Sequence, residues 1–207
     1  MTSANSVGEQ RVVLENVSWL TYVSLLDDSR RSRMTYDRGT LEIMSPSKSH
    51  ENIGRLIGRM VEAFTEERLI EIVSVASTTV KLEMLEKGFE ADEAYYIGHA
   101  DAVRSKSELD FAVDPVPDLV IVVDVSRSSM GKLPIFAAFR VPEVWQYRGD
   151  ALRLLALSDG SYVEQKQSSV LPGFPVAAMI ETLSHRSEVG ETELIRRFRG
   201  TCRQDAR

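Results

Sequence analysis

The stretch that most constrains this chain is residues 117–132, which read PDLVIVVDVSRSSMGK. Its apolar run shows no polar alternation, and apolar residues on both faces are typical of a strand buried in the middle of a sheet. Asp118 and Asp124 stand at the two ends of the run, and Lys132 follows a serine-rich turn. Because an unpaired buried carboxylate is costly, each aspartate needs a partner or a bound cation. The stretch therefore predicts a central strand with a capping or functional acid at each end.

The remaining pattern predicts an α/β (α+β) fold, a mixed β-sheet flanked by helices with an added β-meander. A hairpin is expected over residues 34–44, with Gly39 in its turn, and an amphipathic helix follows a Ser/Pro break at 45–49. Residues 86–92 read as an acidic, turn-rich link. The other expected strands are 70–75, 78–84, 93–97, 118–125, 144–147, 152–157 and 161–164, and the other expected helices are a short one after residue 16, 129–139, 176–183 and 191–198.

Length and charge limit the class of protein. The 207 residues suit one domain, expected over residues 13–200, with a disordered segment 1–12 and a flexible tail 201–207. The net charge of −6 argues against a nonspecific nucleic-acid coat protein but not against a nuclease, whose metal ligands are acidic. The single cysteine, Cys202, excludes an internal disulfide. No apolar run approaches the roughly 18 residues of a membrane span, so we expect a cytoplasmic protein.

Three residues form the candidate catalytic set. Asp92 precedes the expected strand 93–97, Asp124 follows the central strand, and Lys132 lies in the helix expected next. Two strand-borne acids can coordinate magnesium, and a lysine can orient a water for attack on phosphorus or neutralise charge on the phosphate. Asp118 lies roughly 20 Å from Asp124 along the strand, so one metal cannot use both. Asp118 therefore favours a capping role, while for Asp124 a metal-binding and a helix-capping role with Ser126, Ser128 and Ser129 both remain open.

Basic residues and histidines complete the candidates. His50 opens the long amphipathic helix on its apolar face, so it points to the sheet either as a core-edge histidine or as an active-site group. Arg30, Arg31 and Arg33 form a basic cluster that is either a solvated connector or a phosphate contact. His99 and His185 show no ligand spacing, so no zinc site is expected.

In order and spacing, these motifs resemble the bacterial putative restriction endonuclease family of the PD-(D/E)XK nuclease superfamily. The resemblance runs from about residue 15 to 200. The matching segments are GTLEIMSP at 39–46 followed by His50 at a helix start, GFEADEAYYI at 88–97, the stretch 117–132, and VPEVWQY at 141–147.

The resemblance implies a restriction-endonuclease-like core with a magnesium or manganese ion between two acids. Asp92 takes the position of the first acid, Lys132 that of the lysine, and Asp118 that of the aspartate that opens the second strand. Val122 stands where the family has its second acid, a glutamate. Asp124 lies on the same face about 6–7 Å further along. Either its carboxylate takes the place of the missing glutamate at position 122, or the chain is catalytically impaired.

Two functions from different classes follow. The first is a metal-dependent endonuclease that hydrolyses phosphodiester bonds in nucleic acid, impaired by Val122, with Asp92, Asp124, Lys132 and His50 as its site. The second is a non-catalytic nuclease-fold binding or scaffold protein. The resemblance also implies DNA as a partner and a homodimer.

Overall fold

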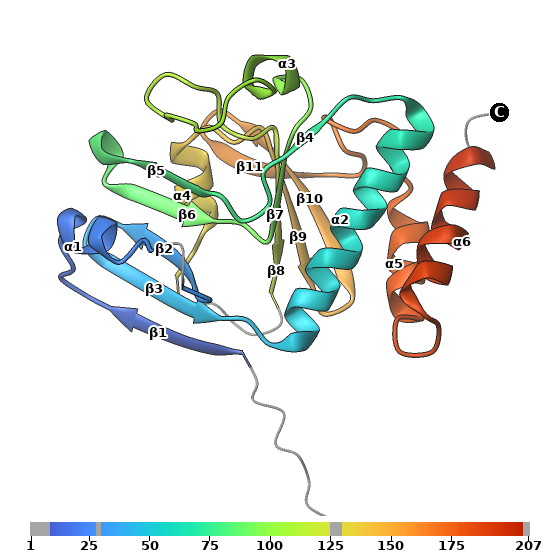
Figure 1. The fold of residues 1–207 in the computed structure, drawn as a ribbon, viewed down its shortest axis with the longest axis horizontal. Helices are drawn as coiled ribbons and strands as arrows, with labels where there is room; N and C mark the ends of the chain where they lie inside the picture. Colours follow the sequence, from blue (N-terminus) through green and yellow to red (C-terminus); the bar gives the residue numbers. More distant parts are fainter. Residues whose placement is uncertain (1–8, 28–29, 125–129, 205–207) are drawn as a thin grey trace, which may run out of the picture.

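The computed structural model describes residues 9–27, 30–124 and 130–204. The chain forms two β-sheets with helices on their outer faces (Figure 1). This arrangement confirms the predicted α+β class with a mixed sheet flanked by helices. Ser126, Ser128 and Ser129, and most of the segment expected to be disordered, lie outside the described residues.

The first sheet is antiparallel, and its five strands lie in the order β1-β3-β2-β6-β5. The hairpin predicted around Gly39 is confirmed as β2 and β3, and Gly39 has a φ of 96°, which a residue with a side chain rarely adopts. The strands are β1 (Gln10–Leu14), β2 (Arg33–Asp37), β3 (Thr40–Ser45), β5 (Thr79–Leu82) and β6 (Lys87–Glu90).

The second sheet is mixed, and its six strands lie in the order β11-β10-β9-β8-β7-β4. The predicted central strand is β8, whose five residues are all buried. It pairs in parallel with β9 and antiparallel with β7, and β9, β10 and β11 form the predicted meander. The strands are β4 (Val73–Ser74), β7 (Glu93–Tyr96), β8 (Leu119–Val123), β9 (Glu143–Arg148), β10 (Ala151–Ser158) and β11 (Ser161–Gln165).

Helices cover one face of the six-stranded sheet, and the five-stranded sheet with α4 covers the other (Figure 1). Ser47 caps the long helix α2, because its side chain accepts a hydrogen bond from the backbone N–H of His50. The helices are α1 (Trp19–Ser24), α2 (Lys48–Arg68), α3 (Ala100–Val103), α4 (Leu133–Ala138), α5 (Val176–Ser184) and α6 (Glu191–Gln204), with a 3₁₀ turn η1 (Glu83–Leu85).

Alternation along β8 divides the core between these two faces. Leu119, Ile121 and Val123 pack under α2, α5 and α6 in one cluster. Val120 and Val122 pack against α4 and the five-stranded sheet in another. The end of β8 therefore lies between two hydrophobic clusters, and it is the place where the acids predicted for the site should meet.

Several sequence predictions differ from the structure. Residues 70–72, expected as strand, precede β4; residues 83–84, also expected as strand, belong to η1; and residues 130–132, expected as helix, precede α4. Residues 87–90, expected as part of an acidic link, form β6, because Lys87 pairs with Asp37 and Glu90 pairs with Arg30, so their charges are compensated inside the fold. Residues 10–12, expected to be disordered, belong to β1, an edge strand held by backbone pairing to β3. Residues 201–204, expected as a flexible tail, continue α6, and Cys202 is buried within the core.

Candidate functional site

Asp92 is the centre of the most highly connected group of charges. It follows β6 and precedes β7, and its side chain is only 6% exposed. One carboxylate oxygen, Oδ1, lies 2.7 Å from His50 Nε2 and 3.0 Å from an Arg33 guanidinium nitrogen. The other, Oδ2, accepts a 2.6 Å hydrogen bond from the backbone N–H of Val123 at the end of β8. Both oxygens of the predicted first acid are therefore bound by donors of the protein.

The surroundings of Asp92 favour a charged pair. Burial acts to raise the pKa of the Asp92 carboxyl, but the hydrogen bond from His50 and the charges of His50 and Arg33 outweigh it and lower that pKa. Burial likewise acts to lower the pKa of His50, whereas its bonds to Asp92 and Glu9 raise it overall. His50 is therefore stabilised as an imidazolium between two carboxylates.

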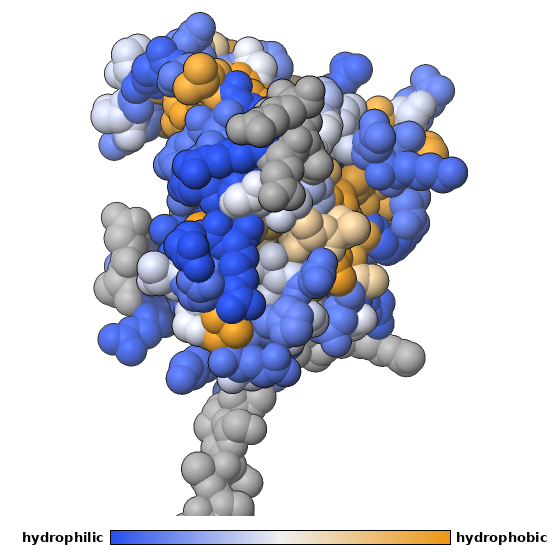
Figure 2. All heavy atoms as spheres, turned by 90° about the vertical axis from the view of Figure 1, so that its right-hand side faces the viewer, coloured by the Kyte–Doolittle hydropathy of each residue, from blue (hydrophilic) through white to orange (hydrophobic). Residues whose placement is uncertain are grey.

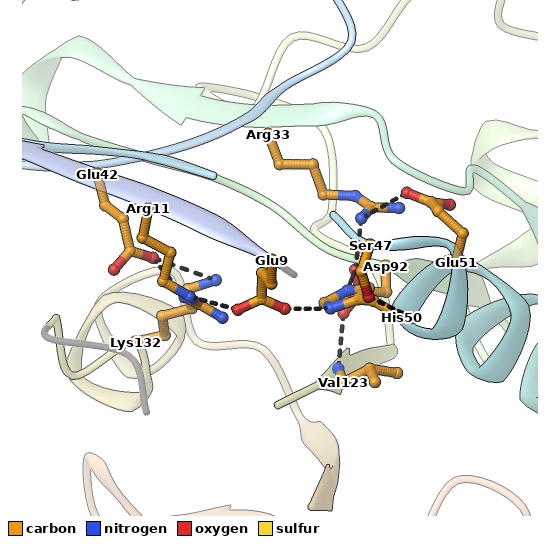
Figure 3. Close-up of polar contacts among 10 residues, drawn as sticks. All are labelled: Glu9, Arg11, Arg33, Glu42, Ser47, His50, Glu51, Asp92, Val123 and Lys132. Carbon is orange, nitrogen blue, oxygen red and sulfur yellow. Dashed lines mark hydrogen bonds and ion pairs between the residues drawn. The ribbon is translucent and has the colours of Figure 1, made fainter. Parts of the chain in front are cut away.

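Asp92 and His50 belong to a longer chain of alternating charges that runs along the end of β8 (Figure 3). Its links are ion pairs between successive members, contributed by β1, β2, β3, α2 and the start of α4. The chain reads, in spatial order, Lys132, Glu42, Arg11, Glu9, His50, Asp92, Arg33 and Glu51.

The far end of this chain holds the predicted lysine. Lys132 Nζ lies 3.6 Å from Glu42 Oε1, and Glu42 also accepts a 2.9 Å hydrogen bond from Arg11. Arg11 bonds Glu9 at 2.6 Å, and Glu9 in turn lies 2.7 Å from His50 Nδ1. Glu42 is 1% exposed, so this carboxylate lies inside the protein with its cations.

Asp124 lies in a separate cavity of about 580 Å³ beyond the carboxyl ends of β8 and β9. Ligands commonly bind outside the carboxyl ends of parallel strands. Asp124 accepts a 2.7 Å hydrogen bond from Gln146 on β9, and the cavity is also lined by Val122, Lys132 and Arg148. The structure thus brings Asp124 and Lys132 to one cavity, and it places Val122 in the wall between them and the core.

Asp92 is absent from the lining of this cavity. It lies against the first turns of α2, where a Cβ built on Gly54 would meet Asp92 at 3.6 Å and Val123 at 3.8 Å. Val122 and Asp124 line the cavity on the α4 side together with Phe136. The two predicted metal ligands, Asp92 and Asp124, therefore hydrogen-bond to different partners, and only Asp124 lines this cavity.

The residues around Asp92 fit a divalent cation poorly. The carboxylate already accepts hydrogen bonds from His50 and the Val123 amide and forms an ion pair with Arg33, so its two cationic partners supply the charge that a metal would supply. Within residues 9–27, 30–124 and 130–204, no group of three or more His, Cys, Asp or Glu side chains is placed to hold a metal ion. Val122 contributes no ligand where a second acid is expected.

Asp118 has the capping role predicted for it. Its Oδ2 accepts hydrogen bonds from the backbone N–H groups of Ile97 and His99 at 2.7 and 3.0 Å, and its Oδ1 lies 2.6 Å from His99 Nδ1. Asp118 thereby fixes the loop that follows β7, and His99 is engaged there rather than in a zinc site.

Sequence reasoning missed five members of the charge chain: Glu9, Arg11, Arg33 as a partner of Asp92, Glu42 and Glu51. Glu9 and Arg11 fell in the segment expected to be disordered. Arg33 was visible only as one of three clustered arginines. Glu42 carried a usable signal, because it is an acid on the buried side of an apolar hairpin strand and therefore requires cationic partners.

Comparison with known proteins agrees with these motifs. The family described as Putative restriction endonuclease matches residues 19–183, from the first residue of α1 to α5. A search of curated proteins gives no match. In the part of the chain that the structure describes, no helix is long and apolar enough to cross a membrane.

Proposed function

Because the chain belongs to the family described as Putative restriction endonuclease, we propose that it is a nucleic-acid nuclease whose metal-dependent cleavage is impaired at position 122. The substrate class is a phosphodiester of DNA or RNA. The chemical step expected of the family is attack of water on phosphorus, with a magnesium or manganese ion supplying Lewis acidity when bound.

The observation that carries this proposal is the position of Val122. Its side chain is 5% exposed and lies in the wall of the cavity that Asp124 and Lys132 also line. A carboxylate at this position would point to the same space as Asp124 and lie near the Lys132 ammonium. Valine offers neither a ligand nor a proton acceptor, so one of the very few carboxylates that such a site depends on is missing.

Lys132 and Asp124 keep the roles proposed for them in that cavity. Lys132 is 13% exposed and pairs with Glu42, so its ammonium is held in place while remaining at the cavity wall. It is suited to binding a phosphate oxygen. Asp124, held by Gln146, is suited to orienting a water or completing a cation site once a second carboxylate is present.

The pairing of Asp92 supports a second candidate function, a non-catalytic binding or scaffold protein. An acid that must bind a metal should be free to do so, whereas Asp92 has a protein donor on each oxygen, His50 and the Val123 amide, and an ion pair with Arg33. In this alternative the charge chain is a structural element, and nucleic acid binds without being cut.

A cleavage assay separates the two candidates. Supercoiled plasmid DNA and a labelled RNA are incubated with wild type, Val122→Glu and the isosteric uncharged control Val122→Gln, each with Mg²⁺, Mn²⁺ or EDTA. We expect little cleavage by wild type and Val122→Gln, and metal-dependent cleavage by Val122→Glu that is lost again in Val122→Glu with Lys132→Ala. Efficient cleavage by wild type would contradict the impairment. If folded Val122→Glu cuts neither substrate, the non-catalytic alternative takes its place.

A further inference from the structure

A polar groove of about 800 Å³ lies apart from the cavity of Asp124 and Lys132 and is lined by neither residue. It lies between the segment that leads into β2, strand β5 and the loop after α3. Its basic lining residues outnumber its acidic ones. The basic residues are Arg30, Arg31, Arg33, Lys81, Arg104 and Lys106, and the acidic residues are Asp27, Glu51, Glu90 and Glu108.

Two of these cations are available to a ligand. Arg31 and Lys81 are exposed, and neither has an ion-pair partner among the residues that the structure describes. The others are already engaged: Arg30 with Glu90, Arg104 with Asp101 and Glu71, and Lys106 with Asp114. Arg31 and Lys81 come from different elements and face the same groove, as phosphate-binding cations do.

Hydroxyl groups accompany the cations. Ser32, Ser77, Thr78 and Ser107 line the groove, and no aromatic side chain does. Serine and threonine hydroxyls contact phosphate oxygens, whereas bases of single strands are bound by stacking on aromatic rings. The lining therefore suits a sugar–phosphate backbone better than exposed bases.

The groove adjoins the charge chain at its Arg33 end. Arg33 lines the groove, and the same side chain lies 3.0 Å from both Glu51 and Asp92. Glu51 also lines the groove and is half-exposed. A polyanion in the groove would consequently lie beside the Asp92 group.

The basic residues of α6 are less available to bind a polyanion. Figure 2 views the molecule from the side of α6 and shows a mainly hydrophilic surface. The arginines there have carboxylate partners on α6 itself or on α2: Arg196 and Arg197 pair with Glu193, Arg199 with Glu66 and Glu67, and Arg203 with Glu67. Their charge is compensated locally, which leaves the groove as the better polyanion surface.

We propose that this groove binds the sugar–phosphate backbone of a nucleic acid through Arg31 and Lys81, largely independently of base sequence. The inference rests on the proposed function for its ligand class, and it adds the surface on which that ligand lies. It also selects the phosphate-contact alternative for the basic cluster at residues 30–33, with Arg31 as the residue that makes the contact.

The test is DNA binding by fluorescence anisotropy with a labelled duplex and a labelled single strand, in EDTA so that no cleavage intervenes. Arg31→Glu with Lys81→Glu is compared with wild type and with the control Arg140→Glu with Lys166→Glu. Both control residues are exposed, lie away from the groove and change the net charge equally. Circular dichroism and thermal melting verify that the variants are folded.

We expect the groove variant to bind at least about tenfold more weakly than the control, with the slope of log K against log salt reduced by about 2. Equal affinity and equal slope in the two double variants would overturn the groove assignment, as would a wild type that binds neither DNA. The cleavage assay with Val122→Glu leaves the groove residues unchanged, so its result is independent of the result of this binding experiment. If wild type binds DNA through the groove and also cleaves it efficiently, the groove assignment stands and the proposed impairment at Val122 is wrong.

Discussion

Two buried carboxylates near the ends of the central strands are satisfied in different ways. Glu143, the first residue of β9, is 1% exposed and accepts from neutral donors: the Trp145 indole N–H at 2.6 Å, the Ser168 hydroxyl at 2.6 Å and the Ser169 amide at 2.7 Å. Asp92, similarly buried, accepts hydrogen bonds from the His50 side chain and one backbone amide and forms an ion pair with Arg33. The first arrangement is a fixed anchor, and the second depends on charge.

This difference indicates a structural role for Glu143, whereas the environment of Asp92 responds to charge. Glu143 holds the loop at residues 168–170 to the sheet with uncharged groups that do not titrate near neutral pH. Asp92 is held in part by the His50 imidazole, whose charge changes with pH, and by the fixed charge of Arg33. A third acid, Glu93, lies next to Asp92 with its nearest cation, Arg55, at 3.9 Å, and burial there raises its pKa from 4.5 to about 7.

The largest effect is expected for Glu143→Gln. The amide loses one acceptor, which leaves at least two of the buried donors around Glu143 without a partner. We expect a loss of about 3–5 kcal/mol in the free energy of unfolding, since each unsatisfied buried donor costs about 1–3 kcal/mol. Urea unfolding measures it, with the exposed Glu164→Gln as control. A loss equal to that of the control would show that Glu143 is not an anchor.

Asp92→Asn should lower the free energy of unfolding by about 2–3 kcal/mol, which is less than the loss expected for Glu143→Gln. The amide oxygen can still accept from one donor, and Arg33 and His50 keep their second partners, Glu51 and Glu9. The same urea experiment measures the loss. A stabilised Asp92→Asn protein would mean that Asp92 is strained in the fold and kept for its chemistry, which would support a catalytic role over a structural one.

Glu93→Gln should raise the free energy of unfolding at alkaline pH, whereas the two preceding substitutions lower it. The raised pKa of Glu93 means that its contribution to stability is complete below about pH 4.5 and is lost as the pH rises to about 7. The variant should therefore match wild type near pH 4 and exceed it by about 1–2 kcal/mol at pH 8. Thermal unfolding across this pH range is the measurement, and a constant difference at every pH would contradict the assignment.

The smallest change in stability is expected for His50→Gln. Because its pKa is raised by Asp92 and Glu9, the stability that protonated His50 provides is complete below its ordinary value of 6.5 and declines as the pH rises through the higher folded value. His50→Gln should remove this decline while keeping one hydrogen bond. Titration of the ring by NMR checks the direction directly, and a pKa at or below 6.5 would contradict the ion pair with Asp92.

The sequence predicted the scaffold well because the strands and helices follow period-2 and period-3.6 patterns of apolar residues. The helix capped by Ser47 was predicted from such a pattern, the hairpin from the turn at Gly39, and the buried strand β8 from its uninterrupted apolar run. β6 was missed because its ends are the charged residues Lys87 and Glu90. Their partners Asp37 and Arg30 lie far away in the chain, and no local pattern reports such a pairing.

The site was predicted only in part for the same reason. Asp124 and Lys132 are close in sequence and line one cavity, whereas Asp92 and His50 meet only through the packing of α2 on the sheet. Alternation along β8 placed Val122 and Asp124 on one face correctly. It could not show that the Val123 amide donates a hydrogen bond to Asp92.

Metal binding by calorimetry tests the central claim, that Val122 leaves the site without its second carboxylate. Mn²⁺ is titrated into wild type, Val122→Glu and Val122→Gln under identical conditions. We expect no saturable heat for wild type and Val122→Gln, and a single saturable site for Val122→Glu. Tight stoichiometric binding of Mn²⁺ by wild type would contradict the claim, and so would the absence of binding in a correctly folded Val122→Glu protein.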